Sequence, residues 1–165
     1  DYILYNDVEE QKIINFSNLL SENKSISFIR FMRGGIYDGP FESYSDNLFY
    51  VPQDKQYFYT NQAALWKTKD LKKIHNLGPD LHIANKDWRN SFEYQATKIC
   101  NELNIKGLFC YYGENKRGLY HYDSTVFSHI CTALVKGKWN MTEYPEEMGG
   151  LIKEYKINIM KRGWV

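Results

Sequence analysis

One apolar stripe constrains the fold of this chain more than any other feature. Its members recur at intervals of four, four, three and four residues, and they are Trp88, Phe92, Ala96, Ile99 and Leu103. This spacing places all five on one face of a helix, and that face must pack against another layer. Short apolar stretches at residues 81–84 and 108–112 lie on either side of the stripe. A helix between two such strands predicts a crossover above a sheet.

The rest of the chain supplies further elements of both kinds. Apolar spacing predicts helices at residues 8–22 and 61–76, and β-forming residues predict strands at 26–32, 48–51, 56–60 and within 151–165. Residues 125–135 fit either a helix or a strand. Hairpins mixed with crossovers predict an α+β fold. We expect a single domain, residues 1–165, with a mixed, mostly antiparallel sheet and three or more helices packed on it.

The segment from Gly107 to Ala133 concentrates the reactive side chains, with two of the four histidines and two of the three cysteines of the chain. Apolar residues flank a Gly-Glu-Asn-Lys-Arg-Gly turn within it. This pattern predicts a hairpin that pairs Leu108–Tyr112 with Leu119–Tyr122. A hairpin so rich in titratable groups could line a site.

Within this segment, Cys110 and the residues after it resemble the phosphate loop of phosphatases, where a thiolate faces backbone N–H groups and an arginine. The resemblance implies that Cys110 is a nucleophile. However, the spacing puts Lys116 rather than Arg117 at the phosphate-clamping position, and lysine lacks the bidentate fork of arginine. Gly118 stands where that loop has serine or threonine. The alternative is that Cys110 is a buried strand residue.

A second partial motif lies near the N-terminus. Gly35-Ile36-Tyr37 and Phe49-Tyr50-Val51 resemble the core of GIY-YIG nucleases. Pro52 stands where the second motif of that family has glycine, and residues 61–76 contain no arginine to stabilise a leaving phosphate. The nuclease motif is therefore incomplete.

The remaining candidate site combines His121, Asp123 and His129. On a strand, residues 121 and 123 point to one side, so the carboxylate could orient the imidazole as a base, and His129 could join from the next element. Lys116, Arg117 and Tyr112 would then contact an anionic substrate. The alternative is structural, with Asp123 as the N-cap of the following segment. A small metal centre of His121, Asp123 and His129 is geometrically open as well, but we assign no metal ligand, and the cofactor stays unknown.

Charge and cysteine usage limit the partners and the compartment. The net charge is +1, which gives no support to a nucleic acid partner, although one remains open. The charge is unevenly placed, at −4 over residues 1–60 and +5 over residues 61–165. Three cysteines without a paired framework predict buried thiols and a reducing, cytoplasmic compartment, although a lost signal peptide remains open. No apolar run is long enough to span a membrane.

Two classes of function fit these observations. The first is a small soluble interaction or ligand-binding domain with an aromatic, partly basic face, whose partner is a protein or a small anionic ligand. The composition, rich in Lys, Asn and Tyr, suits a phage, viral or pathogen accessory factor. The second is a small hydrolase or transferase, nuclease-like or phosphoesterase-like, with a site in the 108–129 hairpin region. The sequence leaves open whether the protein is an enzyme.

Overall fold

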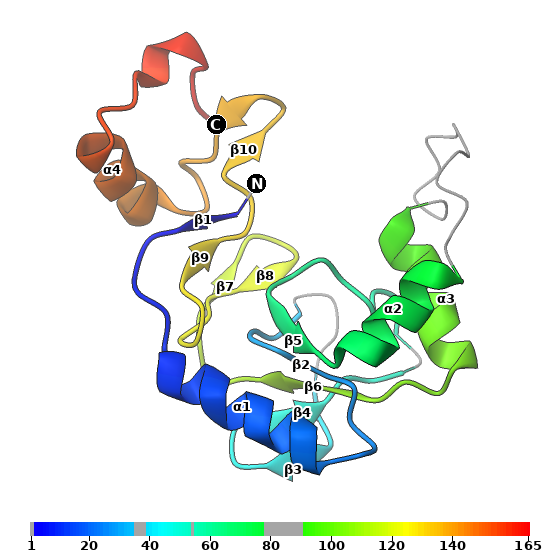
Figure 1. Ribbon diagram of the computed structural model, residues 1–165. Helices are drawn as coiled ribbons and strands as arrows, with labels where there is room; N and C mark the ends of the chain where they lie inside the picture. The colour runs from blue at the N-terminus through cyan, green and yellow to red at the C-terminus, as the bar shows by residue number, and fades with distance from the viewer. Residues whose placement is uncertain (1, 35–38, 54, 78–90) are drawn as a thin grey trace.

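A mixed five-stranded sheet forms the centre of the protein (Figure 1), which a computed structural model describes for residues 2–34, 39–53, 55–77 and 91–165. In spatial order its strands are β3 (Ser43–Ser45), β4 (Leu48–Tyr50), β6 (Gly107–Cys110), β2 (Phe28–Arg30) and β5 (Ala64–Trp66). Strands β2 and β6 run parallel, and the other neighbours run antiparallel. The predicted α+β class with a mixed, mostly antiparallel sheet is confirmed.

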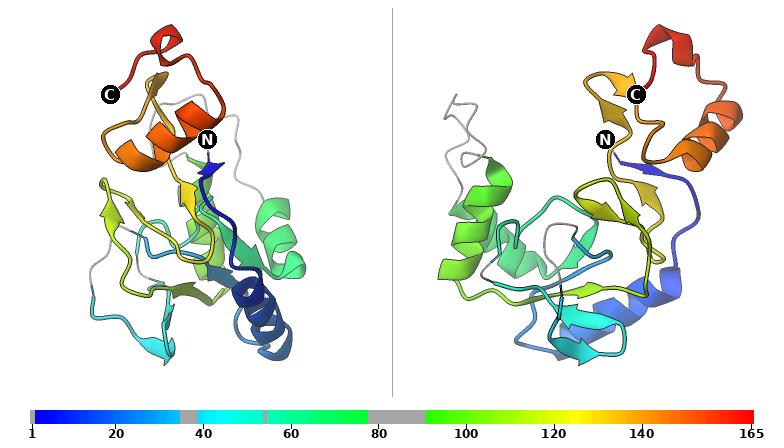
Figure 2. Two further views of the ribbon diagram at one scale, coloured as in Figure 1. Left: turned by 90° about the vertical axis from the view of Figure 1, so that its left-hand side faces the viewer. Right: turned by 180° about the vertical axis from the view of Figure 1, so that it is seen from behind.

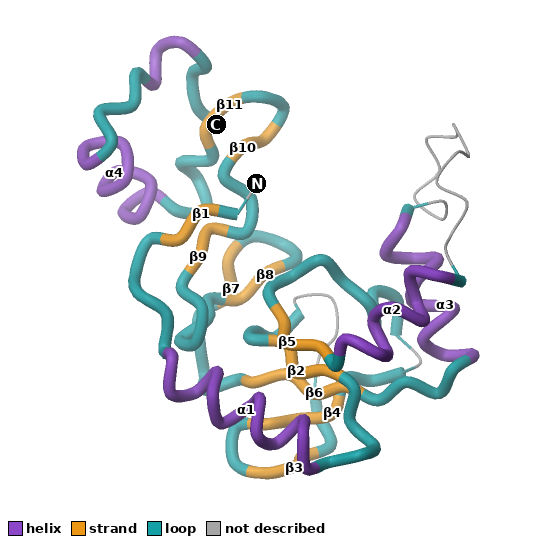
Figure 3. The backbone as a smooth tube through the Cα atoms, in the orientation of Figure 1, coloured by secondary structure: helices purple, strands orange, loops and turns teal. Residues whose placement is uncertain are grey.

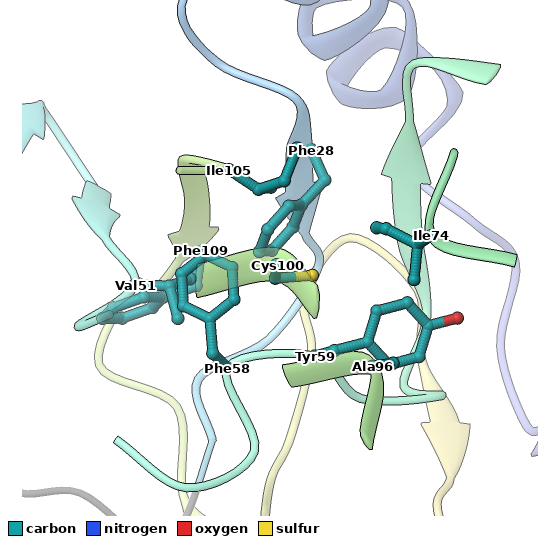
Figure 4. Close-up of a cluster of buried hydrophobic side chains, with 9 residues drawn as sticks. All are labelled: Phe28, Val51, Phe58, Tyr59, Ile74, Ala96, Cys100, Ile105 and Phe109. Atoms are coloured by element: carbon teal, nitrogen blue, oxygen red, sulfur yellow. The ribbon is translucent and has the colours of Figure 1, made fainter. Parts of the chain in front are cut away.

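Helices cover both faces of this sheet. Helix α1 (Glu10–Glu22) packs on one face, where Phe16 and Leu20 meet Ile29 and Leu108. Helices α2 (Thr68–Asn76) and α3 (Phe92–Glu102) cover the other face. There the buried cluster of Figure 4 consists of Phe28, Val51, Phe58, Tyr59, Ile74, Ala96, Cys100, Ile105 and Phe109. Because side chains alternate along a strand, neighbouring residues of β2 and β6 serve opposite faces.

Residues 129–165 form a smaller unit, here called the C-terminal lobe, which stands at one side of the sheet (Figures 1 and 2). Its elements are β9 (His129–Ile130), β10 (Leu134–Val135), β11 (Lys138–Trp139), α4 (Pro145–Glu154) and a 3-10 turn (Ile159–Lys161). Strand β1 (Ile3–Leu4) pairs with β9, and the short hairpin of β7 (Lys116–Arg117) and β8 (His121–Tyr122) lies between lobe and sheet (Figure 3). The lobe has its own apolar cluster, which consists of Ile130, Ala133, Tyr144, Met148 and Leu151.

Several predicted elements are present with shorter bounds. The helix predicted at 8–22 begins at Glu10, and the strands predicted at 26–32 and 48–51 contain β2 and β4. The open choice for residues 125–135 is resolved in favour of strands, since β9 and β10 lie there. Within the predicted stripe, Ala96 is buried, Phe92 and Ile99 are half-buried, and Leu103 is 37% exposed beyond the end of α3. The predicted strand at 81–84 and Trp88 lie outside the described residues.

The predicted hairpin of residues 108–112 with 119–122 is wrong. Strand β6 pairs with β2 and β4 instead, and all four of its residues are buried. A strand covered on both faces is apolar throughout, so its sequence does not show which strands flank it. The hairpin that does form is the shorter β7–β8 pair, whose turn begins at Gly118 with a φ of 56°.

Two other predictions for this part of the chain are also wrong. Residues 56–60 form turns rather than a strand, and the helix predicted at 61–76 begins only at Thr68. Ala64, Leu65 and Trp66 pair with β2 as an edge strand. Pairing with a neighbouring strand outweighs helix propensity, which is overridden here even though Ala and Leu are good helix formers.

The tail is not a strand, contrary to the alternation of Tyr155, Ile157 and Ile159 with polar residues. Helix α4 continues to Glu154, because Met148 and Leu151 recur at helical spacing and are buried in the lobe. Lys156 then adopts a left-handed conformation with a φ of 52°. The Asn158 side chain accepts a hydrogen bond from the Met160 N–H at 3.1 Å and starts the 3-10 turn.

Candidate functional site

The predicted site residue His121 lies where the parallel strands β2 and β6 end. Gly34, four residues after β2, forms an antiparallel bridge with His121. The carboxyl ends of parallel strands are the usual place for ligand sites in sheets flanked by helices. Two side chains that the sequence did not single out also reach this point, namely Gln62 and Thr132. Gln62 was missed because residues 61–76 were predicted as one helix.

Both ring nitrogens of His121 have side-chain partners. Nδ1 lies 3.3 Å from the Gln62 amide nitrogen, which donates, so Nδ1 is the accepting nitrogen. Nε2 lies 3.3 Å from the Thr132 hydroxyl. Burial lowers the pKa of His121, Glu143 raises it and His129 lowers it, with a net decrease. His121 is therefore a neutral, oriented imidazole at neutral pH.

His129, at the start of β9, contacts Cys131, which directly follows that strand. Its Nδ1 lies 2.5 Å from the Phe127 carbonyl, so Nδ1 carries the proton and Nε2 faces Cys131 Sγ at 3.4 Å. This is the arrangement of a base beside a thiol, but His129 is only 2% exposed and Cys131 only 4%. Burial raises the pKa of the Cys131 thiol to about 12 and lowers the pKa of His129. The thiol stays protonated, and the Tyr2 ring covers His129 at 5.2 Å.

Asp123 binds Arg117 rather than His121. The Arg117 Nε donates to both oxygens of Asp123 at 3.0 Å. Its Nη2 donates to Glu147 on α4 at 2.6 Å, and its Nη1 donates to the Glu143 carbonyl at 3.1 Å. The guanidinium also lies over the Tyr144 ring, 5.3 Å from its centre. These contacts join the β7–β8 hairpin to the lobe, so Arg117 is engaged internally rather than directed at a substrate.

The alternative prediction of Asp123 as an N-cap is wrong by one residue. The Ser124 hydroxyl accepts hydrogen bonds from the Val126 and Phe127 N–H groups at 3.2 and 3.0 Å. The same hydroxyl donates to the Phe31 carbonyl at 2.5 Å. Ser124 therefore holds the segment that leads into the lobe.

The other predicted site residues do not join His121. Cys110 is buried in the cluster beneath α1, and burial raises the pKa of its thiol to about 12. Tyr112 is 40% exposed, and the Lys12 ammonium lies over its ring at 4.4 Å. Lys116 is exposed on β7. As predicted, all three cysteines are free and buried.

The C-terminal lobe presents a surface of a different kind. Residues 155–165, here called the C-terminal arch, leave α4 and return to pair beside β11, where the Trp139 N–H donates to the Gly163 carbonyl at 3.0 Å. The arch contains Lys156, Lys161 and Arg162, all exposed, and no acidic side chain. Tyr155, Met160 and Trp164 on the same arch are 65%, 76% and 52% exposed.

Folding withdraws two acidic side chains from the surface of the lobe, whereas Glu146 and Glu154 stay exposed. Residues 129–165 contain four glutamates, and two of them turn inward. Glu147 binds Arg117, and Glu143 accepts from the Asn140 amide at 3.1 Å. The six cations of the lobe all stay exposed, and within the described residues none forms an ion pair. They are Lys136, Lys138, Lys153, Lys156, Lys161 and Arg162.

Other kinds of site find no support in the described part of the chain. Its His, Cys, Asp and Glu side chains contain no group of three that could hold a metal ion. None of the helices described is long and apolar enough to cross a membrane. Comparison with models of protein families, with curated proteins and with solved structures finds no match to this chain.

Proposed function

We propose that this protein is a binding domain that holds an anionic partner on its C-terminal lobe. The proposed surface consists of the C-terminal arch and the neighbouring β10–β11 hairpin. The observation that carries the proposal is a difference between the acidic and the basic side chains of the lobe. Glu143 and Glu147 are used inside the fold, whereas six cations remain exposed without an ion pair among the described residues.

The physical reason is electrostatic complementarity. Neighbouring cations such as Lys161 and Arg162 repel one another when no counter-charge is near. An anionic partner relieves this repulsion and releases the counterions that the surface collects. The exposed rings of Tyr155 and Trp164 add apolar contact area of the kind that is enriched at binding surfaces. We propose that this surface is the basic, aromatic face that the sequence predicts.

The alternative, a hydrolase or transferase in the 108–129 region, has less support. Its best chemical pair is His129 with Cys131, and both side chains are almost completely buried. His121 is accessible in part, but its two nitrogens are occupied by Gln62 and Thr132. We therefore favour binding over catalysis.

Retention on immobilised heparin tests the proposal. The wild-type protein is expected to bind at low salt and to elute as the salt rises, because exposed charges are screened over about 8 Å at physiological ionic strength. A variant with Lys156→Gln, Lys161→Gln and Arg162→Gln should elute at clearly lower salt. Equal elution of this variant and the wild type would contradict the proposal.

The chain offers a control matched in charge. Lys24, Lys69 and Lys72 are exposed cations outside the lobe. Replacing these three by Gln changes the net charge by the same amount as the arch variant. The control should elute close to the wild type, since the proposed surface is intact. Equal loss of retention in both triple variants would show that only overall charge matters.

A further inference from the structure

We infer that the anionic partner is a single-stranded nucleic acid whose bases stack on Tyr155 and Trp164 while its phosphates meet the arch cations. This inference rests on the proposed function and names the class of its ligand. Two features of the arch carry it, the exposure of the two rings and the presence of cations next to them in the chain.

The two aromatic rings of the arch are free to accept a base. Tyr155 and Trp164 are 65% and 52% exposed, and neither ring stacks on another ring or on a cation among the described residues. Most of the other aromatic side chains in the described residues contact another ring, as Phe28 and Trp66 do at 4.2 Å between ring centres. An exposed ring with an open face is the platform on which unpaired bases stack.

Cations lie next to both rings in the chain. Lys156 follows Tyr155 directly, and Lys161 and Arg162 precede Trp164 by three and two residues. Alternation of positive side chains with aromatic platforms is how proteins follow a single strand, because phosphates and bases alternate along it. A duplex hides its base faces, so it would use only the cations. An acidic peptide offers no flat rings to stack.

Apart from the cations, which the proposal assigns to phosphates, the arch offers few side chains that read base edges. The one amide side chain in it belongs to Asn158, whose oxygen accepts from the Met160 N–H at 3.1 Å. Sequence is read mainly by side chains that hydrogen-bond to base edges. Binding should therefore tolerate many sequences, with affinity set by stacking and by salt.

Fluorescence anisotropy with a labelled oligothymidylate of about ten nucleotides, within the usual site size, tests the inference. Trp164→Ala is expected to weaken binding about tenfold through the loss of one stacked base. Tyr155→Ala should act in the same direction, and Trp164→Phe should restore most of the affinity. Heparin elution should not change in any of these variants, because heparin has no bases. Leu77→Ala, at a 60% exposed apolar residue outside the lobe, is the control and should bind as the wild type does.

Salt dependence separates the contribution of the cations. Removing Lys161 and Arg162 together should lower the slope of log affinity against log salt by roughly 1.4, at about 0.7 per phosphate contact on a single strand. Trp164→Ala should leave this slope unchanged.

The possible outcomes distinguish this inference from the proposed function. If the oligonucleotide and heparin both bind and the two ring variants have no effect, the inference is overturned and the proposed function stands. The same conclusion follows if duplex DNA or polyglutamate, at equal charge, displaces the labelled oligonucleotide as effectively as an unlabelled single strand does. If neither the oligonucleotide nor heparin binds at low salt, both are overturned.

Discussion

Replacing Arg117 by Ala tests how the lobe is held against the sheet. Arg117 is the residue through which the β7–β8 hairpin reaches α4, by bonds to Asp123, to Glu147 and to the Glu143 carbonyl. The substitution leaves two carboxylates without this partner in a partly buried place. Solvent reaches 24% of the Arg117 side chain, 16% of Asp123 and 14% of Glu147. We therefore expect a large loss of stability that is concentrated in the lobe.

The magnitude follows from the burial. Breaking a fully buried ion pair by removing one partner costs about 3–5 kcal/mol. Because all three side chains are partly solvated, we expect about 2–3 kcal/mol for Arg117→Ala. For a chain of this size, that corresponds to a decrease in Tm of about 5–10 °C. The stability of Arg117→Lys should lie between that of the wild type and that of Arg117→Ala, because lysine keeps the positive charge but lacks the several N–H donors of the guanidinium.

Circular dichroism during heating and urea titration measures the loss. Lys116→Ala is the matched control, because Lys116 is exposed on the same strand and forms no ion pair among the described residues. This control should change stability by no more than about 0.5 kcal/mol. A double-mutant cycle with Asp123→Ala should give a coupling of about 1 kcal/mol or more. A Tm for Arg117→Ala equal to that of Lys116→Ala would refute the structural role.

Three further predictions concern the core and the buried titratable groups. Gly107→Ala should destabilise by about 1–3 kcal/mol through overpacking, because its Cβ would lie 2.0 Å from the Phe28 ring, and the urea midpoint checks this. Burial lowers the pKa of His121 and of His129, so the unfolded chain binds protons first as the pH falls. Stability should therefore decrease below about pH 6.5, which is the pKa of histidine in the unfolded chain. In His129→Gln the urea midpoint should change less between about pH 7.5 and pH 5.5 than it does in the wild type. The native protein should react with almost no thiol reagent and the denatured protein with three equivalents, since all three cysteines are free and buried; early uptake in the native state would show an open thiol.

Part of the candidate site could be predicted, and the rest depended on pairing across the fold. The sequence singled out His121, Asp123, His129 and Arg117, and all four lie near the junction of sheet and lobe. It did not reveal that Asp123 binds Arg117, because the distance between two side chains six residues apart depends on the turn between them. The contact of His129 with Cys131 was within reach, since residues two apart on a strand share a face.

The sequence by itself determined the fold class and several elements, because periodicity is a local property. The α1 stripe and the β-forming residues of β2 and β4 specify their own conformation, and three unpaired cysteines specify buried thiols. The sequence also showed that positive charge gathers after residue 60.

Only the tertiary structure decided which elements meet. Strand β6 pairs with β2 and β4 because a buried apolar strand joins whichever neighbours the topology brings to it, and no local signal names them. Residues 64–66 become a strand for the same reason. The exposed charge of the lobe is likewise a tertiary property. It arises because Glu147 and Glu143 find partners inside the fold, while the cations of the arch find none among the described residues and remain in water.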